Sequence, residues 1–251
     1  MPPLARPILA LWAVPRSTST AFEWMMRMRG DMSCWHEPFG EVWYQGESPD
    51  WPRLQPESVR TPGLTYQSRW AELLSDASRG PVFIKDFPHF IHALWSDDFL
   101  GHFTHSFLIR DPARTVASMY KHWPEFDERE TGFADQRRLF DELTQRLGTP
   151  PPVIDSDDLM ADPPGIVAAW CHAVDIDWMP EALSWEPGAR DEVSWWDGGS
   201  FHESLRNSSG LEPQPRTSVD ISEAPAPIRE LAAKLRPHYE HLRAHRIEVG
   251  S

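Results

Sequence analysis

A hydroxyl-rich loop follows the first apolar run of the chain and could bind an anion. Residues 8–14 are apolar, and Pro15-Arg16-Ser17-Thr18-Ser19-Thr20 comes directly after them. If that run is a strand and a helix begins near Ser17, the free N–H groups and positive end of the helix point at the loop. The loop itself supplies a permanent positive charge and four hydroxyl groups. The charge comes from Arg16, and the hydroxyls come from Ser17, Thr18, Ser19 and Thr20. The alternative is that the hydroxyls only cap the helix.

A second polar motif follows another apolar run. In the segment 107–118, Arg110 ends the expected strand, and Ser118 comes eight residues later in a helix that Asp111 caps and Pro112 begins. An arginine at the carboxyl end of a parallel strand lies beside the crevice where open α/β sheets bind ligands. Its planar guanidinium suits a phosphate.

Together the two motifs closely resemble the sulfotransferase family, whose first loop reads P-[KR]-S-[GT]-[ST]-[ST]. The resemblance implies transfer of a sulfonate group from 3′-phosphoadenosine-5′-phosphosulfate (PAPS) to an acceptor hydroxyl, which leaves 3′-phosphoadenosine-5′-phosphate (PAP). It assigns Arg110 and Ser118 to the 3′-phosphate and gives Arg16 an electrostatic role on the leaving phosphate. By matching position, the resemblance assigns binding of the 5′-phosphosulfate to Arg16, Ser17, Thr18, Ser19 and Thr20.

Two weaker similarities extend toward the C-terminus. The segment 155–159 with Asp162-Pro163 resembles the family's Y-E-D-L…D-P segment, which marks the last core strand. The segment 205–210 resembles a late loop that closes over the nucleotide, and so adds Ser208, Ser209 and Gly210 to the expected nucleotide site.

The sequence also departs from the family pattern at two positions. Thr18 replaces the glycine of the cytosolic branch, and Ala21 replaces a tryptophan that stacks on adenine in many members. Another group, such as a tryptophan of the late loop, must then hold the adenine ring of the nucleotide.

Sulfonate transfer also needs a base for the acceptor proton and charge stabilisation. In carbohydrate sulfotransferases and their bacterial relatives this base is a glutamate in an E-P dipeptide after the second strand, which Glu37 matches. Pro38 favours extended backbone at Glu37, and strand alternation predicts that His36 points to the opposite side. The alternative is that Glu37 pairs with an arginine and only orders the loop.

The cytosolic small-molecule branch instead uses a histidine after the third strand, in a K-T-H-L-P segment. Here that segment reads Lys85-Asp86-Phe87-Pro88-His89, with Phe87 in the histidine position. Lys85 matches the lysine that faces the transferring sulfonate and is the expected charge stabiliser, unless it is only a solvated strand end. Asp86 and His89 are lesser candidates for the base.

Composition narrows the function classes. The 251 residues carry 24 basic and 38 acidic side chains, a net charge of -14, which disfavours nucleic acid and anionic membranes as partners. Cys34 and Cys171 fit neither a disulfide framework nor metal-ligand spacing, so both are expected to be buried in a reducing compartment, the cytoplasm. The first apolar run is too short to span a bilayer. No metal site is expected, the acceptor is expected to be a small molecule, and a homodimer remains open.

The elements that must position these residues alternate between strands and helices, which is typical of a parallel sheet. We expect one domain over residues 1–251, an α/β fold with about five parallel strands flanked by helices and with irregular loops forming the acceptor pocket. The expected strands are 8–13, 32–36, 82–86, 106–110 and 153–155. The expected helices are 17–28 with Glu23 and Arg27 facing water, 112–122, 165–174, and 228–246 broken or bent at Pro237.

Residues 42–79, 123–148 and 179–227 do not fit this alternation and are expected to form lids and pocket walls. Several tryptophans in or beside these stretches either line the acceptor pocket or anchor loops to the core, with Trp195 and Trp196 the best pocket candidates. The set comprises Trp43, Trp51, Trp178, Trp185, Trp195 and Trp196.

Two other functions stay open. A P-loop kinase or phosphohydrolase would use Asp86 or Asp111 for magnesium, but the loop lacks the G-x-x-x-x-G-K-[ST] pattern. A non-catalytic nucleotide-binding protein of the same fold is the other, although the retained Arg16, Arg110, Ser118 and a base disfavour it.

Overall fold

A computed structural model describes residues 7–50, 60–188, 203–215 and 220–250. The strands are β1 (Ile8–Ala13), β2 (Ser33–His36), β3 (Val82–Asp86), β4 (Phe103–Ile109) and β5 (Val153–Asp155). The helices are α1 (Ser19–Met28), α2 (Pro38–Gln45), α3 (Tyr66–Ala77), α4 (Asp97–Leu100), α5 (Pro112–His122), α6 (Phe133–Leu147), α7 (Ser156–Ala161), α8 (Pro163–Ala173), α9 (Glu203–Arg206) and α10 (Ala226–Arg243). Three 3₁₀ turns are η1 (Pro88–Leu94), η2 (Glu128–Thr131) and η3 (Pro180–Leu183).

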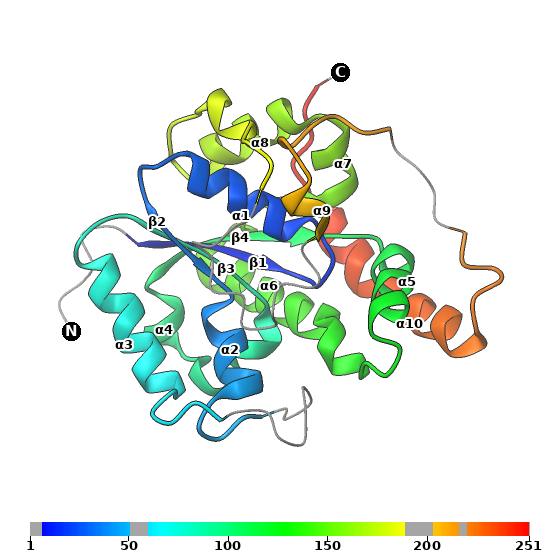
Figure 1. The fold of residues 1–251 in the computed structure, drawn as a ribbon, viewed down its shortest axis with the longest axis horizontal. Coiled ribbons are helices and arrows are strands. Elements are labelled where there is room, and N and C mark those ends of the chain that lie inside the picture. Colours follow the sequence, from blue (N-terminus) through cyan, green and yellow to red (C-terminus); the bar gives the residue numbers. More distant parts are fainter. Residues whose placement is uncertain (1–6, 51–59, 189–202, 216–219, 251) are drawn as a thin grey trace.

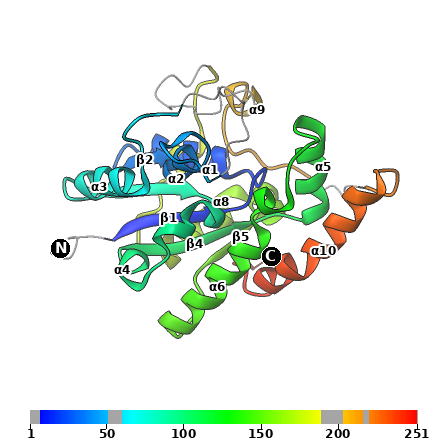
Figure 2. The same cartoon turned by 90° about the horizontal axis from the view of Figure 1, so that it is seen from below.

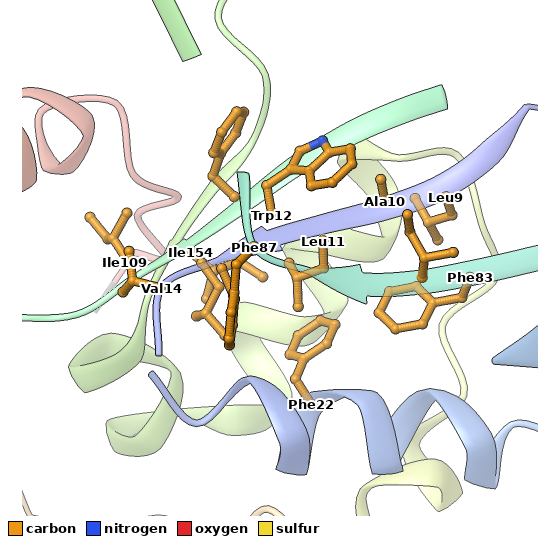
Figure 3. Close-up of a cluster of buried hydrophobic side chains, with 14 of the residues drawn as sticks. Leu9, Ala10, Leu11, Trp12, Val14, Phe22, Phe83, Phe87, Ile109 and Ile154 are labelled. Atoms are coloured by element: carbon orange, nitrogen blue, oxygen red, sulfur yellow. The ribbon is translucent and has the colours of Figure 1, made fainter. Parts of the chain in front are cut away.

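The strands form one parallel sheet of five in the order β2-β3-β1-β4-β5, which confirms the expected fold class. All residues of β1 and β3 are buried, because helices cover both faces of the sheet. Figure 1 shows α1 and α8 on one face and α2, α3 and α4 on the other. In Figure 3, Phe22 of α1 points at the sheet beneath Leu11 and Phe83, while Trp12 lies on the opposite side of β1.

The strand order places the two polar motifs side by side. From β1 the chain crosses β3 to reach β2, whereas from β4 it moves the other way to β5. Such a reversal opens a crevice at the carboxyl ends of the two strands where it occurs, here β1 and β4. The hydroxyl-rich loop follows β1, and Arg110 follows β4, so both motifs lie at this crevice.

Helix α10 packs against the part of the sheet that contains β4 and β5. It packs against α5 and α6, as Figure 2 also shows. Of the two alternatives expected at Pro237, a break or a bend, the break is wrong, because the helix runs through Pro237. Proline removes one backbone N–H, but Leu235, Tyr239 and Leu242 are buried, and this packing outweighs the lost hydrogen bond.

Most other expected elements are confirmed, with shifted ends. Strand β4 starts at Phe103 and ends one residue before Arg110, and α1 begins at Ser19. Two of the stretches expected to be irregular contain the regular helices α3 and α6. The spacing of Leu139, Phe140 and Leu143, all buried, was the signal for α6.

Cys171 is buried as expected, whereas Cys34 is only half-buried. Among the described helices, none has both the length and the apolar character needed to cross a membrane. Over the same described residues, no group of three His, Cys, Asp or Glu side chains could hold a metal ion.

Candidate functional site

The hydroxyl-rich loop has a strained backbone. Arg16 and Thr18 adopt φ of 62° and 71°, in the left-handed region. For a β-branched residue this costs roughly 1–2 kcal/mol, and it explains why glycine suits position 18 in the cytosolic branch. Such strain persists where neighbours impose it, often at ligand sites. Here Thr18 Oγ1 lies 2.8 Å from Ser156 Oγ, and Ser17 Oγ donates to Val14 O at 2.6 Å.

These hydroxyl contacts bear on the capping alternative. The Thr18 side chain makes no capping hydrogen bond to α1, and the first helical bond is Phe22 N to Thr18 O at 3.1 Å. Thr18 therefore does not cap α1 through its hydroxyl, which argues against the capping alternative for this residue. The first N–H groups of α1 have no partner within the helix and face the loop.

The two polar motifs are in direct contact. Arg16 Nε donates to Ser118 Oγ at 3.0 Å, and Arg110 Nη1 donates to the carbonyl oxygen of Arg16. Asp111 accepts from Ala113 N at 2.8 Å and so caps α5, as expected. The loop after β1 and the start of α5 thus form one surface.

Positive charge is concentrated on this surface. Burial, then the charges of Arg114 and Arg16, lower the pKa of Arg110 to about 10. The Nε atom of Arg110 is buried without a hydrogen-bond partner. Burial, Arg16 and Lys121 also lower the pKa of His122. An anion would relieve the repulsion and satisfy the buried donor.

A second cluster lies where β2 and β3 end. Lys85 is fully buried, and its Nζ lies 2.5 Å from Glu37 Oε1 and 3.9 Å from Glu23 Oε2. His36 Nδ1 lies 2.6 Å from Glu23 Oε2, and Arg27 binds Glu23 Oε1 through Nη2 at 2.8 Å. Burial alone would raise the pKa of Glu23, but His36, then Lys85 and Arg27, hold it below its ordinary value of 4.5.

This cluster rules out two alternatives and corrects two expectations. Lys85 is not a solvated strand end, and the partner of Glu37 is this lysine and not an arginine. Glu23 is buried where water was expected, because α1 packs that face against β2. His36 does not point away from Glu37: their Nε2 and Oε1 atoms lie 3.9 Å apart.

The backbone at Glu37 explains this last difference. It is left-handed, with φ of 42°, and not extended as Pro38 suggested. Pro38 is the first residue of α2, and Glu37 turns the chain from strand into helix. That turn breaks the strand alternation, so consecutive side chains reach the same cluster.

Asp86 and His89 occupy different surroundings. Asp86 accepts hydrogen bonds from Phe39 N at 2.9 Å and Phe87 N at 2.8 Å, and burial, with Glu37, raises its pKa. His89 is buried among Trp43, Phe87 and Phe90, and burial lowers its pKa to about 3. Neither ring nitrogen of His89 has a hydrogen-bond partner.

The late loop is tied to the fold by its own polar atoms. Ser208 Oγ donates to Leu205 O at 2.7 Å and accepts from Trp185 Nε1 at 3.1 Å, while Ser209 Oγ donates to Glu212 at 2.6 Å. Gly210 pairs with Ser184, and a Cβ atom there would lie 2.5 Å from Leu183 O. Through η3, this loop is anchored to α1.

The tryptophans divide between core and undescribed segments. Trp43 and Trp185 are buried, and Trp178 packs half-buried against the core. Trp51, Trp195 and Trp196 lie outside the described residues.

A hollow of about 460 Å³ lies at the opposite, amino-terminal end of the strands. It is lined by Arg27, Met28, Met32, Ser33, Cys34, Trp35 and Asp76.

Two contributors to the site were missed in the sequence. Glu23 lies four residues before Arg27, a spacing that equally suits an exposed ion pair, so no local signal marked it. Ser156 was part of a recognised segment but had no assigned contact. Its position directly after β5 was the available signal, because β5 neighbours β4 at the carboxyl edge.

Comparisons with known proteins cover nearly the whole chain. A sequence model described as a sulfotransferase domain matches residues 7–231. Two solved structures share the fold: the sulfotransferase domain from the curacin biosynthetic pathway, with TM-score 0.55, 14% identity and coverage of 92% of this chain and 97% of that one; and the sulfotransferase domain from the Synechococcus PCC 7002 olefin synthase, with TM-score 0.51, 12% identity and coverage of 92% and 95%.

Two curated relatives come from Arabidopsis thaliana. Branched-chain-amino-acid aminotransferase-like protein 2 is 25% identical over 246 residues, which are 93% of this chain and 42% of that protein. Branched-chain-amino-acid aminotransferase-like protein 1 is 34% identical over 146 residues, 55% of this chain and 25% of that protein. The chain thus spans less than half the length of either relative.

Proposed function

Because this chain belongs to the sulfotransferase domain family, we propose that it transfers a sulfonate group from PAPS to a hydroxyl of a small-molecule or carbohydrate-like acceptor. The observation that carries the proposal is the contact between the two polar motifs, in which Arg16 binds Ser118 and Arg110 binds the Arg16 backbone. Separate anion-binding groups are thereby available to one doubly phosphorylated nucleotide.

The donor nucleotide would bind across the carboxyl ends of β1 and β4. The backbone N–H groups at the start of α1, with Arg16, would hold the 5′-phosphosulfate. Arg110 has a buried donor without a partner and lies beside two further arginines, which suits the 3′-phosphate. Ser118 already accepts a hydrogen bond from Arg16 and can donate its own proton to the same phosphate.

Transfer itself needs little beyond positioning and charge. As the acceptor oxygen attacks sulfur, the bond from sulfur to the phosphate oxygen breaks, and negative charge collects on the phosphate, where Arg16 stabilises it. Lys85 would neutralise the sulfonate oxygens, and Glu37 would take the acceptor proton. Their contact of 2.5 Å fixes both side chains before substrate arrives.

The proposal also covers the extent of the domain, its compartment, its need for a metal and the remaining site residues. We infer that residues 1–251 act as one cytoplasmic domain that needs no metal for the transfer. Ser208, Ser209 and Gly210 would border the nucleotide through the late loop, and His89 is a less favoured base because its buried, neutral ring lies in an aromatic cage.

A ligand screen separates this function from its rivals. Thermal unfolding is measured with PAP, with ATP plus magnesium, and with buffer alone. Sulfonate transfer predicts stabilisation by PAP, since a ligand that binds only the native state raises its stability by mass action. Stabilisation by ATP plus magnesium alone would favour a kinase or phosphohydrolase. Mass spectrometry of a panel of hydroxyl compounds incubated with PAPS then tests for the gain of one sulfonate group.

Substitution of the proposed base separates turnover from binding. Glu37→Gln keeps the size and polarity of the side chain but cannot take the proton, so turnover should fall roughly 100-fold or more while PAP affinity stays within about twofold. Glu230→Gln, an exposed change on α10, is the matched control. Wild-type turnover in Glu37→Gln would assign the base to another residue and contradict this part of the proposal.

A further inference from the structure

His36 lies between two buried carboxylates at the candidate centre. Its Nδ1 is 2.6 Å from Glu23 Oε2 and its Nε2 is 3.9 Å from Glu37 Oε1. The three side chains are only 4%, 2% and 8% exposed, respectively. A carboxylate can only accept a hydrogen bond, so Nδ1 carries the proton of the neutral ring and Nε2, on the Glu37 side, is the basic nitrogen.

Lys85 creates the need for such a group. Its ammonium is fully buried, and its nearest counter-charge is Glu37, at 2.5 Å. If Glu37 kept the acceptor proton, the fully buried Lys85 would lose that counter-charge, which is costly. Passing the proton to His36 Nε2 restores the Glu37 carboxylate. The new imidazolium charge is then stabilised by Glu23.

The two carboxylates beside His36 favour this transfer, and the two nearby cations are each held by a carboxylate. Glu23 of α1 binds Arg27 and lies 3.9 Å from Lys85 Nζ, and Glu37 at the start of α2 binds Lys85 of β3. Asp86, at the end of β3, has a pKa raised by burial, so it adds little negative charge. When the His36 ring is neutral, the charges of these two carboxylates and two cations sum to zero. A proton added to the ring then lies between the two carboxylates.

We propose that His36 is a positioning residue that relays the acceptor proton: Glu37 takes it, and His36, held by Glu23, receives it from Glu37. This rests on the function proposed above. The new bond joins the acceptor oxygen to sulfur, the sulfur–oxygen bond of the phosphosulfate breaks with its electron pair on PAP, and the proton ends on Nε2. The 3.9 Å gap closes by roughly 1 Å in the substrate complex, as catalytic hydrogen bonds often do.

The relay is tested by the two amide substitutions of His36. In His36→Asn the amide nitrogen lies near the position of Nδ1 and keeps the bond to Glu23, but the relay atom is gone. We expect unchanged PAP affinity, a kcat lowered about 10- to 100-fold with phenol as acceptor, whose hydroxyl stays protonated near neutral pH, and an acidic limb of the kcat–pH profile reduced to one ionisation. His36→Gln also lowers kcat, because an amide cannot take a proton. His172→Asn, an exposed change on α8, is the control. Wild-type kcat and pH profile in His36→Asn would overturn the relay.

A spectroscopic measurement needs no turnover. With ¹⁵N-labelled histidine, the NMR signals of His36 should show Nδ1 protonated and Nε2 unprotonated at neutral pH. Glu37→Gln should shift the Nε2 signal, whereas Glu230→Gln should not. Protonation at Nε2, or an Nε2 signal indifferent to Glu37→Gln, would overturn the relay. Lack of PAPS turnover in the wild-type protein would remove the proposed function instead, and the NMR result still decides the geometry of the relay.

Discussion

Arg110 joins the two halves of the candidate nucleotide site through one side chain. It holds the backbone of Arg16 through Nη1 and keeps a buried Nε for a ligand. Hydrogen bonds that involve a charged group contribute about 1.5–3 kcal/mol each. The pKa of about 10 leaves this guanidinium charged at neutral pH, even among its like-charged neighbours.

Removing this side chain should therefore weaken nucleotide binding. For Arg110→Ala we predict a Kd for PAP raised about 10- to 100-fold, measured by calorimetry. Arg229→Ala, an exposed arginine on α10, controls for the loss of one charge. Unchanged affinity in Arg110→Ala, with a folded protein by circular dichroism, would move the 3′-phosphate away from β4.

Glu23 makes stability depend on pH. Its folded pKa lies below the ordinary value of 4.5, so the folded state favours its charged form. The resulting stabilisation is complete above about pH 4.5 and is lost as pH falls toward the folded pKa, because protons then bind the unfolded state more strongly.

Glu23→Gln should lose about 3–5 kcal/mol in the free energy of unfolding near pH 7, because Arg27 loses its buried partner and Lys85 keeps only one of its two buried counter-charges. The difference from the wild-type protein should shrink as pH falls below about 4.5. Urea unfolding of both proteins between neutral and acidic pH measures it. A difference that stays constant down to pH 3 would show that Glu23 is not ionised in the folded state.

At the scale of elements, α10 fixes the edge of the sheet that carries the site. Arg236 binds both oxygens of Asp111, at 2.7 and 3.1 Å, and Tyr239 Oη donates to Asp155 Oδ2 at 2.7 Å. Asp111 caps α5 and Asp155 caps α7, so these contacts set the helix starts next to Arg110 and at Ser156. The last helix thereby supports residues far from it in the sequence.

Tyr239→Phe should cost about 1–3 kcal/mol of stability, because Asp155 remains buried without its hydroxyl donor. The matched control is Tyr120→Phe on α5, where the ring is 39% exposed. Urea unfolding compares the two variants. Equal stability of both would mean that the buried hydrogen bond contributes nothing measurable.

The elements that the sequence predicted share a simple physical cause. Strand β1 is apolar throughout and β3 is apolar over its first three residues, so continuous apolar runs marked them without tertiary information. The resemblance assigned the motifs after β1 and β4 to the two ends of one nucleotide, and the carboxyl ends of parallel strands share the edge where such a ligand binds. Glu23 and His36 could not be placed in the same way. Glu23 is buried because α1 packs against β2, which is a tertiary contact. The approach of His36 to Glu37 depends on a left-handed turn at Glu37 that no local preference predicts, since proline after it favours extended backbone.

At the scale of the whole molecule, the net charge of -14 contrasts with the site. A protein of this charge repels anions on average, so an anionic nucleotide must be recognised by a local cluster. Such a cluster is formed by Arg16, Arg110 and Arg114, because the charges of Arg16 and Arg114 act on Arg110. It lies at the carboxyl ends of β1 and β4, where the strand order reverses. The fold therefore sets one positive site within an acidic protein.

The central claim is that the loop after β1 and the motif after β4 bind opposite ends of one nucleotide. The most direct measurement is calorimetric titration with PAP and, in parallel, with adenosine 5′-phosphate, which lacks the 3′-phosphate. Because Arg110 and Ser118 would bind only PAP at that position, PAP should bind at least about 100-fold more tightly. Equal affinity for the two nucleotides, or no heat with PAP, would contradict the account.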